Sequence, residues 1–225
     1  MTQHPIQATQ APTRIQQNIL ARSERRVLNW LCERLPAWVT PDQLTTLGFF
    51  GAVLVAAGYM LSWIDDEWLG LSLAGYIVNW FGDSLDGSLA RWRRIERPAY
   101  GYFVDHSVDG LAIVLIVGGI GASPYFRLDV ALFGAVGYLL LAIHTFLSAK
   151  VLGEFRLSYM AGGPTELRLM LMAMTMIMPL VGGGTVLGTD FSAFDIFGLV
   201  VASILTTLYV VQSLATARLL ARRGG

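Results

Sequence analysis

The sequence contains few charged residues and almost no cysteine. Lys, Arg, Asp and Glu make up 14% of the 225 residues, against roughly 25% in a typical soluble domain. The single cysteine, Cys32, excludes a disulfide framework within one chain. The formal net charge is zero, so the composition does not indicate a nucleic-acid partner. With 54% hydrophobic residues and a mean hydropathy of +0.55, the chain is predicted to be an integral membrane protein rather than a soluble one.

The N-terminal region lacks the apolar core of a secretory signal peptide. Residues 1–13 are polar and are expected to form a disordered tail. Residues 14–36 carry apolar side chains at helical spacing with arginines between them, which predicts an amphipathic helix in the membrane interface. Packing of this helix on its own membrane domain is a compatible alternative.

Residues 37–225 are predicted to form one all-α domain with six transmembrane helices. Each segment approaches the roughly 20 residues needed to cross the hydrocarbon core, and the fifth is the shortest. No Pro- or Ser-rich linker divides the region after residue 40. The predicted spans cover residues 44–64, 68–92, 102–121, 130–151, 165–181 and 194–220.

The basic residues predict how these helices are oriented. With six spans, 15 of the 16 Lys and Arg residues fall on the side that holds both termini, and only Arg127 falls on the other. Cytoplasmic segments of membrane proteins are enriched in Lys and Arg. Both termini are therefore expected in the cytoplasm, and an inner membrane of the bacterial type is the expected location.

Four aspartates interrupt the second and third apolar segments. Asp83 and Asp86 lie three residues apart, and Asp105 and Asp109 lie four apart, so each pair shares a helix face. The short connection makes the two helices antiparallel neighbours, which places all four carboxylates near the cytoplasmic boundary. Ionisable groups in membrane helices are costly and usually functional.

Divalent cations are the simplest way to hold four carboxylates together in a medium of low dielectric constant. Hard oxygen ligands favour Mg²⁺, with Mn²⁺ or Ca²⁺ as substitutes. Four shared carboxylates suit a centre of two ions. The sequence therefore predicts a two-metal site formed by these aspartates.

The surrounding residues resemble the signature of the CDP-alcohol phosphotransferase family. That signature reads Asp-x-x-Asp-Gly-x-x-Ala-Arg, a spacer, and Gly-x-x-x-Asp-x-x-x-Asp. Here it appears as DSLDGSLAR from residue 83 and GYFVDHSVD from residue 101, with nine residues between. The fixed positions are Asp83, Asp86, Gly87, Ala90, Arg91, Gly101, Asp105 and Asp109.

The resemblance implies transfer of a substituted phosphate from a CDP-linked donor to an alcohol, with release of CMP. It implies that Asp83, Asp86 and Asp105 are the main metal ligands, and that Asp109 is the general base and a further ligand. It also implies a homodimer. The CDP-binding residues would be Gly87, Ala90, Arg91, Gly101 and Thr45. Upstream, Pro41 and Thr45 fit the pattern Pro-Asn-x-x-Thr that many members carry, but Asp42 replaces the Asn.

The substrates remain open at this stage. In one scheme a CDP-aminoalcohol donates to diacylglycerol. In the other, CDP-diacylglycerol donates to a small polar alcohol, and a phosphorylated acceptor would need basic residues, for which Arg156 and Arg168 are the candidates. Either scheme combines a nucleotide from the cytosol with a lipid from the bilayer. A divalent-cation transporter is the alternative of another class, although Arg91 within the motif would repel cations.

Overall fold

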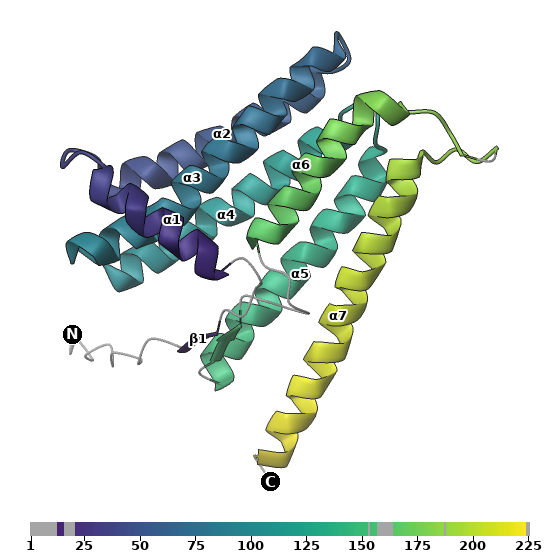
Figure 1. Cartoon of the computed structure of the whole chain (residues 1–225). Helices are drawn as coiled ribbons and strands as arrows, with labels where there is room; N and C mark the ends of the chain where they lie inside the picture. The colour runs from purple at the N-terminus through teal and green to yellow at the C-terminus, as the bar shows by residue number, and fades with distance from the viewer. Residues whose placement is uncertain (1–12, 16–20, 153, 157–163, 187, 224–225) are drawn as a thin grey trace, which may run out of the picture.

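The structure is a computed structural model of the chain. Long helices form nearly all of the part that it describes (Figure 1). The structure describes residues 13–15, 21–152, 154–156, 164–186 and 188–223. Its helices are α1 (Ala21–Arg34), α2 (Pro41–Leu61), η1 (Asp66–Trp68), α3 (Leu69–Arg93), α4 (Pro98–Gly121), α5 (Leu128–Leu152), α6 (Pro164–Val181) and α7 (Ala193–Arg223).

Two three-residue strands accompany the helices. Strand β1 (Thr13–Ile15) pairs in parallel with β2 (Glu154–Arg156). The predicted interfacial helix was expected to begin at residue 14, whereas residues 14 and 15 lie in β1 and α1 begins at Ala21. Nearly all of the predicted tail, residues 1–12, lies outside the described residues. The all-α prediction holds for the rest of the described chain.

The helices begin and end within about four residues of the predicted spans. Local signals explain the starts, because Thr40 caps α2 through a capping box with Gln43 and Pro98 occupies the first turn of α4. Among the described residues, four helices are long and apolar enough to cross a membrane, namely α2, α4, α5 and α7. Helix α3 spans 25 residues but carries the acidic and basic residues of the motif.

Helices α2 and α3 form a tightly packed antiparallel pair. A Cβ atom added to Gly51 of α2 would lie 2.3 Å from the backbone nitrogen of Asn79 in α3. One added to Gly82 would lie 2.3 Å from the backbone nitrogen of Gly48. Glycine is needed at these positions because the two backbones approach so closely. This contact fixes the register of α3 and hence the position of its aspartates.

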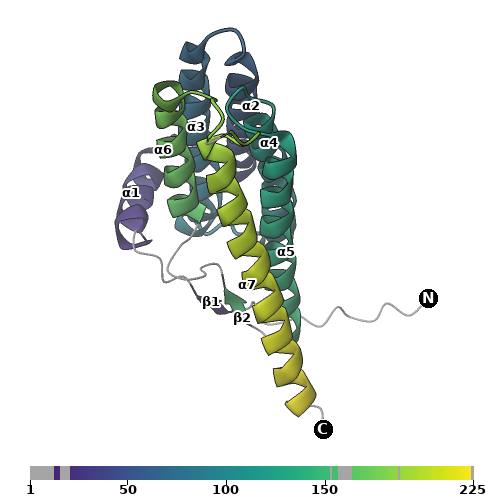
Figure 2. The same cartoon turned by 90° about the vertical axis from the view of Figure 1, so that its right-hand side faces the viewer.

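The remaining helices pack around this pair. Buried side chains of α2, α3, α4 and α6 form the main core, including Tyr59, Tyr76, Ile116 and Met178. The hydroxyl of Tyr59 is hydrogen-bonded to those of Tyr76 and Thr175. Helices α5 and α7 run side by side, as both views show (Figures 1 and 2). Helices α4, α5, α6 and α7 line a common cavity beside the motif.

Helix α1 crosses α3 near the end that carries the motif (Figure 1). Its Cys32 is buried against Leu44, Leu85 and Leu89 in a second, smaller core. The guanidinium of Arg93, at the end of α3, holds the segment between α1 and α2. It donates hydrogen bonds of 2.5–3.3 Å to four backbone carbonyls, those of Leu35, Pro36, Ala37 and Val39.

Removing the hydrogen bonds that Arg93 donates to the segment between α1 and α2 is expected to destabilise the fold. We predict that Arg93→Met lowers the free energy of unfolding by about 2 kcal/mol, because several charge-assisted hydrogen bonds are lost together. Thermal unfolding in detergent, followed by circular dichroism, measures the change. Arg94→Met is the matched control, since Arg94 is exposed at the next position. Equal melting temperatures for the two variants would show that the hydrogen bonds of Arg93 do not stabilise the fold.

Candidate metal and substrate site

Asp86 lies where α3 meets the start of α2. The residue is only 7% exposed. The hydroxyl of Thr45 donates to Asp86 Oδ2 at 2.6 Å, and the backbone N–H of Gly87 donates to Oδ1. The close α2–α3 packing brings Thr45 and Asp86 together although they are 41 residues apart in the chain. Both carboxylate oxygens are thereby held in a defined orientation.

All four motif aspartates line one small cavity between α2, α3 and α4. This cavity has a volume of about 10 Å³, close to the minimum that holds a single water molecule. Asp86 lies close enough to Asp105 and Asp83, and Asp109 close enough to Asp83, for their negative charges to repel one another. The expected convergence of two helix faces therefore appears in the structure as one shared acidic cavity.

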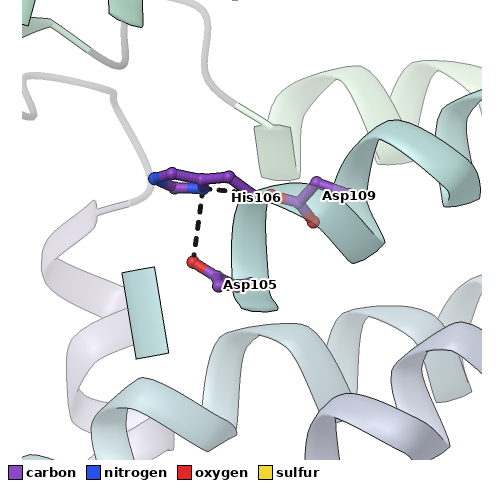
Figure 3. Close-up of side chains that lie close together, drawn as sticks. All are labelled: Asp105, His106 and Asp109. Carbon is purple, nitrogen blue, oxygen red and sulfur yellow. Dashed lines mark ion pairs between the residues drawn. The ribbon is translucent and has the colours of Figure 1, made fainter. Parts of the chain in front are cut away.

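His106 lies beside two of these carboxylates (Figure 3). Its Nδ1 is 3.5 Å from Asp105 Oδ2 and 3.7 Å from Asp109 Oδ2. Its ring also packs against Tyr102 and Phe146, with centroid distances of 4.4 and 5.2 Å. Helical geometry alone points residue 106 about 100° away from residue 105, but the imidazole turns back toward the carboxylates. Asp105, His106 and Asp109 form a cluster in which one ligand atom from each lies within 4.8 Å of the others.

Arg168 of α6 reaches the same site from the opposite wall. Its Nη2 donates to Asp83 Oδ2 at 2.5 Å, and its Nε donates to Asn79 Oδ1 at 2.9 Å. Only 16% of the Arg168 side chain is exposed. Asn79 in turn donates to the backbone carbonyl of Gly48 in α2. Arg168 was predicted as an acceptor-binding residue, and the structure places it on a motif carboxylate.

The predicted nucleotide-binding residues lie at the mouth of a larger cavity. Gly87, Ala90, Arg91 and Gly101 line it together with Thr45. The Arg91 side chain is exposed and folds over Gly87, where an added Cβ would lie 3.2 Å from Arg91 Nη1. An added Cβ at Gly101 would meet no atom within 4 Å. This region is thus open to the outside and bordered by the guanidinium of Arg91.

The two remaining residues of the sequence prediction occupy different settings. Asp42 accepts a hydrogen bond from Arg97, which raises the pKa of the Arg97 guanidinium, and both side chains are about half exposed. Asp42 is therefore engaged at the rim of the cavity. Arg156 is the last residue of β2, and the position of its side chain lies outside the described part of the structure.

The larger cavity continues from the aspartates into an apolar space between α4, α5, α6 and α7. Its volume is about 1100 Å³. Along α4 the part of its wall beyond the aspartates extends from Asp109 to Ile120, a length of about 16 Å at about 1.5 Å per residue. The apolar part is lined by Ile116, Val130, Gly134, Met174, Phe197 and Val201. We call this part the apolar arm.

The donor set fits hard divalent cations. Carboxylate oxygens are the preferred ligands of Mg²⁺, and four of them surround one cavity of ion-sized volume. The Asp105–His106–Asp109 cluster adds a nitrogen at its edge. Asp83, Asp86, Asp105 and Asp109 are the residues suited to hold such ions, with Arg168 and Thr45 orienting two of the carboxylates.

Sequence reasoning missed two residues that line the larger cavity. Asn79 lies four residues before Asp83, so helical spacing alone places it on the same face. Glu24 of α1 accepts hydrogen bonds from Trp80, Ser84 and Thr165. No local pattern predicts the contacts of Glu24, because they join three separate helices.

The chain is similar in sequence to known proteins and to the model of one protein family. The model of the CDP-alcohol phosphatidyltransferase family matches residues 38–215. Cholinephosphotransferase 1 of Danio rerio is 28% identical over 190 residues, covering 76% of this chain and 48% of that protein. Archaetidylinositol phosphate synthases of Pyrococcus horikoshii and Methanothermobacter thermautotrophicus are 33% and 34% identical over 100 and 103 residues.

Those two synthases match 44% and 45% of this chain and 50% and 48% of their own lengths. The chain thus spans about half the length of each of the three relatives. The family model, by contrast, covers most of the chain, including α2 to α6 and all eight positions of the motif. On this evidence the chain belongs to the CDP-alcohol phosphatidyltransferase family.

Proposed function

We propose that the protein is a metal-dependent enzyme that transfers a substituted phosphate from a CDP-linked donor to an alcohol and releases CMP. The observation that carries this proposal is the shared cavity of the four motif aspartates, which also line a larger cavity with one polar and one apolar end. Family membership favours this reaction over cation transport.

Each residue contributes a distinct part of the proposed reaction. Asp83, Asp86, Asp105 and Asp109 would hold two Mg²⁺ ions, which neutralise charge on the diphosphate when bound. Arg91, at the open mouth, would bind a phosphate oxygen of the donor. Thr45, Gly87, Ala90 and Gly101 would border the nucleotide.

The transfer itself is a displacement at phosphorus. The acceptor hydroxyl oxygen bonds to the phosphorus that carries the donated group, and the bond from that phosphorus to the CMP oxygen breaks. Asp109 takes the hydroxyl proton, and CMP leaves as the anion. Asp109 suits this role because it lines the acidic cavity and, of the two motif aspartates of α4, is the one closer along the helix to the apolar arm. A general base must reach the proton that it removes at hydrogen-bond distance.

The apolar arm supports a lipid as one of the two substrates. Ligand cavities of comparable volume bury most of the surface of the molecules that they bind. We infer that a CDP-aminoalcohol donates to diacylglycerol. Arg168 is already bonded to Asp83 and Asn79, which leaves it poorly placed to bind a phosphorylated acceptor. The relative that matches the larger part of this chain is a cholinephosphotransferase.

The membrane arrangement is part of the same proposal. We infer that α3 and α6 cross the membrane with α2, α4, α5 and α7, that both termini face the cytoplasm, and that the site opens at the cytoplasmic boundary of a bacterial-type inner membrane. Residues 37–225 then form the catalytic domain, and α1 lies in the interface. The homodimer implied by the family remains a prediction that light scattering in detergent tests.

Release of CMP by the purified protein tests the function. The protein in detergent with Mg²⁺ is offered CDP-choline or CDP-ethanolamine with diacylglycerol. In parallel it is offered CDP-diacylglycerol with inositol phosphate, glycerol phosphate or serine. We expect CMP release with a CDP-aminoalcohol only when diacylglycerol is present. CMP release only in the mixtures of CDP-diacylglycerol with a polar alcohol would replace this scheme by the other. No CMP release with any pair of substrates would contradict the function.

Filling the apolar arm should change the preference for lipid length. An added Cβ at Gly134 meets no atom within 4 Å, and this residue lines the cavity. We predict that Gly134→Leu lowers kcat/KM for a long-chain lipid substrate about 10-fold, or roughly 1.4 kcal/mol. Activity with short-chain lipids is retained because the arm still accepts them. Gly118→Leu is the control, since Gly118 also has open space around it but does not line the cavity.

A further inference from the structure

An acidic side chain on the amphipathic helix α1 faces the bundle instead of the water. Glu24 Oε1 accepts hydrogen bonds from Thr165 Oγ1 at 2.7 Å and from Trp80 Nε1 at 3.0 Å. Ser84 Oγ lies at 3.4 Å from the same oxygen. A partly buried carboxylate is costly unless it is hydrogen-bonded, and here one oxygen receives donors from both α3 and α6. Glu24 thus connects three helices at one point.

The bond to Thr165 lies in the first turn of α6. Helix α6 begins at Pro164. The hydrogen bond from the Thr165 hydroxyl to Glu24 therefore joins α1 to the start of this helix. Arg168 follows three residues later and therefore lies on the same helix face. Its guanidinium donates to Asp83 Oδ2 and to Asn79 Oδ1. Helix α6 therefore links the hydrogen bond of Thr165 to Glu24 with the hydrogen bonds of Arg168 to Asp83 and Asn79.

We propose that Glu24 is a positioning residue for the metal site. It fixes the first turn of α6, so that Arg168 holds one oxygen of Asp83 and sets the direction of the other. This inference rests on the proposed function only in that Asp83 is taken as a metal ligand. Groups that orient the ligands of a metal commonly contribute about 10- to 100-fold to its affinity.

Two alternatives for Glu24 make different predictions. If Glu24 only attaches α1 to the bundle, the contacts with Trp80 and Thr165 are equivalent, and losing either one affects stability alone. If Glu24 acts through α6, the contact with Thr165 matters for metal binding and the contact with Trp80 does not. Trp80→Phe removes the indole N–H and preserves an aromatic ring, while Thr165→Val removes the hydroxyl at nearly constant volume.

Binding of Mn²⁺ to the full-length protein in detergent, measured by electron paramagnetic resonance, tests the proposal without any substrate. We expect Glu24→Ala and Thr165→Val each to weaken Mn²⁺ binding about 10-fold. The double variant should bind Mn²⁺ no more weakly than either single one, because both remove the same hydrogen bond. Glu24→Gln, which keeps an acceptor oxygen at this position, and Trp80→Phe should stay within about twofold of the wild type.

Wild-type affinity in Thr165→Val would overturn the proposal, as would an equal loss in Trp80→Phe or no Mn²⁺ binding by the wild type. Thr165→Val carries the test if Glu24→Ala does not fold. CMP release is measured separately on the same samples. A wild type that binds Mn²⁺ but releases no CMP would contradict the proposed function and leave the positioning role to be decided by the affinities.

Discussion

Asp86→Asn is expected to abolish CMP release while the protein remains folded. The substitution preserves the volume of the side chain and an oxygen that the Thr45 hydroxyl can contact at its present 2.6 Å. It removes the negative charge from the most buried of the four carboxylates, which is 7% exposed. A divalent cation then loses a charged ligand in a medium of low dielectric constant. We predict a fall in kcat of about 100-fold or more.

The matched control is Asp190→Asn, which makes the same chemical change at an exposed site outside the acidic cavity. Initial rates of CMP release are measured across a range of Mg²⁺ concentrations, and melting temperatures are recorded for each protein. The control should match the wild type in both. CMP release by Asp86→Asn within about threefold of the wild-type rate, at the same melting temperature, would rule out this aspartate as an essential ligand.

Sequence patterns predicted the helices because membrane spans and their boundaries are local features. Runs of apolar residues gave the positions of α2, α4, α5 and α7, and Pro98 explains why α4 begins before its predicted span. The motif spacing placed Asp83 with Asp86 and Asp105 with Asp109, since three and four residues return to the same face of a helix. These local patterns did not predict which side chains of separate helices contact one another.

Contacts between distant segments were not predictable from these patterns. Arg168 was expected near the acceptor, but its partner is Asp83, 85 residues earlier in the chain. The role of Arg93 depends on four carbonyls in a loop that closes over the end of α3. Glu24 resembles any charged residue on the polar face of an amphipathic helix. In each case the side chain acquires its function only when a second or third helix packs against it.

A close approach of α2 and α3 leads to the strongest stability prediction. We expect Gly51→Ala to lower the free energy of unfolding by about 3 kcal/mol or more. The new Cβ would lie 2.3 Å from Asn79 N, 2.7 Å from Asn79 Cα and 2.8 Å from the carbonyl oxygen of Gly75. These are backbone atoms, so no change of side-chain rotamer relieves the overlap, and the two helices must separate.

Separation of the two helices should also reduce activity, because Asn79 lies one turn from Asp83 and donates to the backbone of Gly48. Gly118→Ala is the control, because no atom lies within 4 Å of its added Cβ. This control should unfold at the wild-type temperature or slightly above, since Ala favours helix by up to about 1 kcal/mol over Gly. Thermal unfolding in detergent compares the two. Equal melting temperatures would show that α2 and α3 do not pack through Gly51, and the position of the aspartates would then need another explanation.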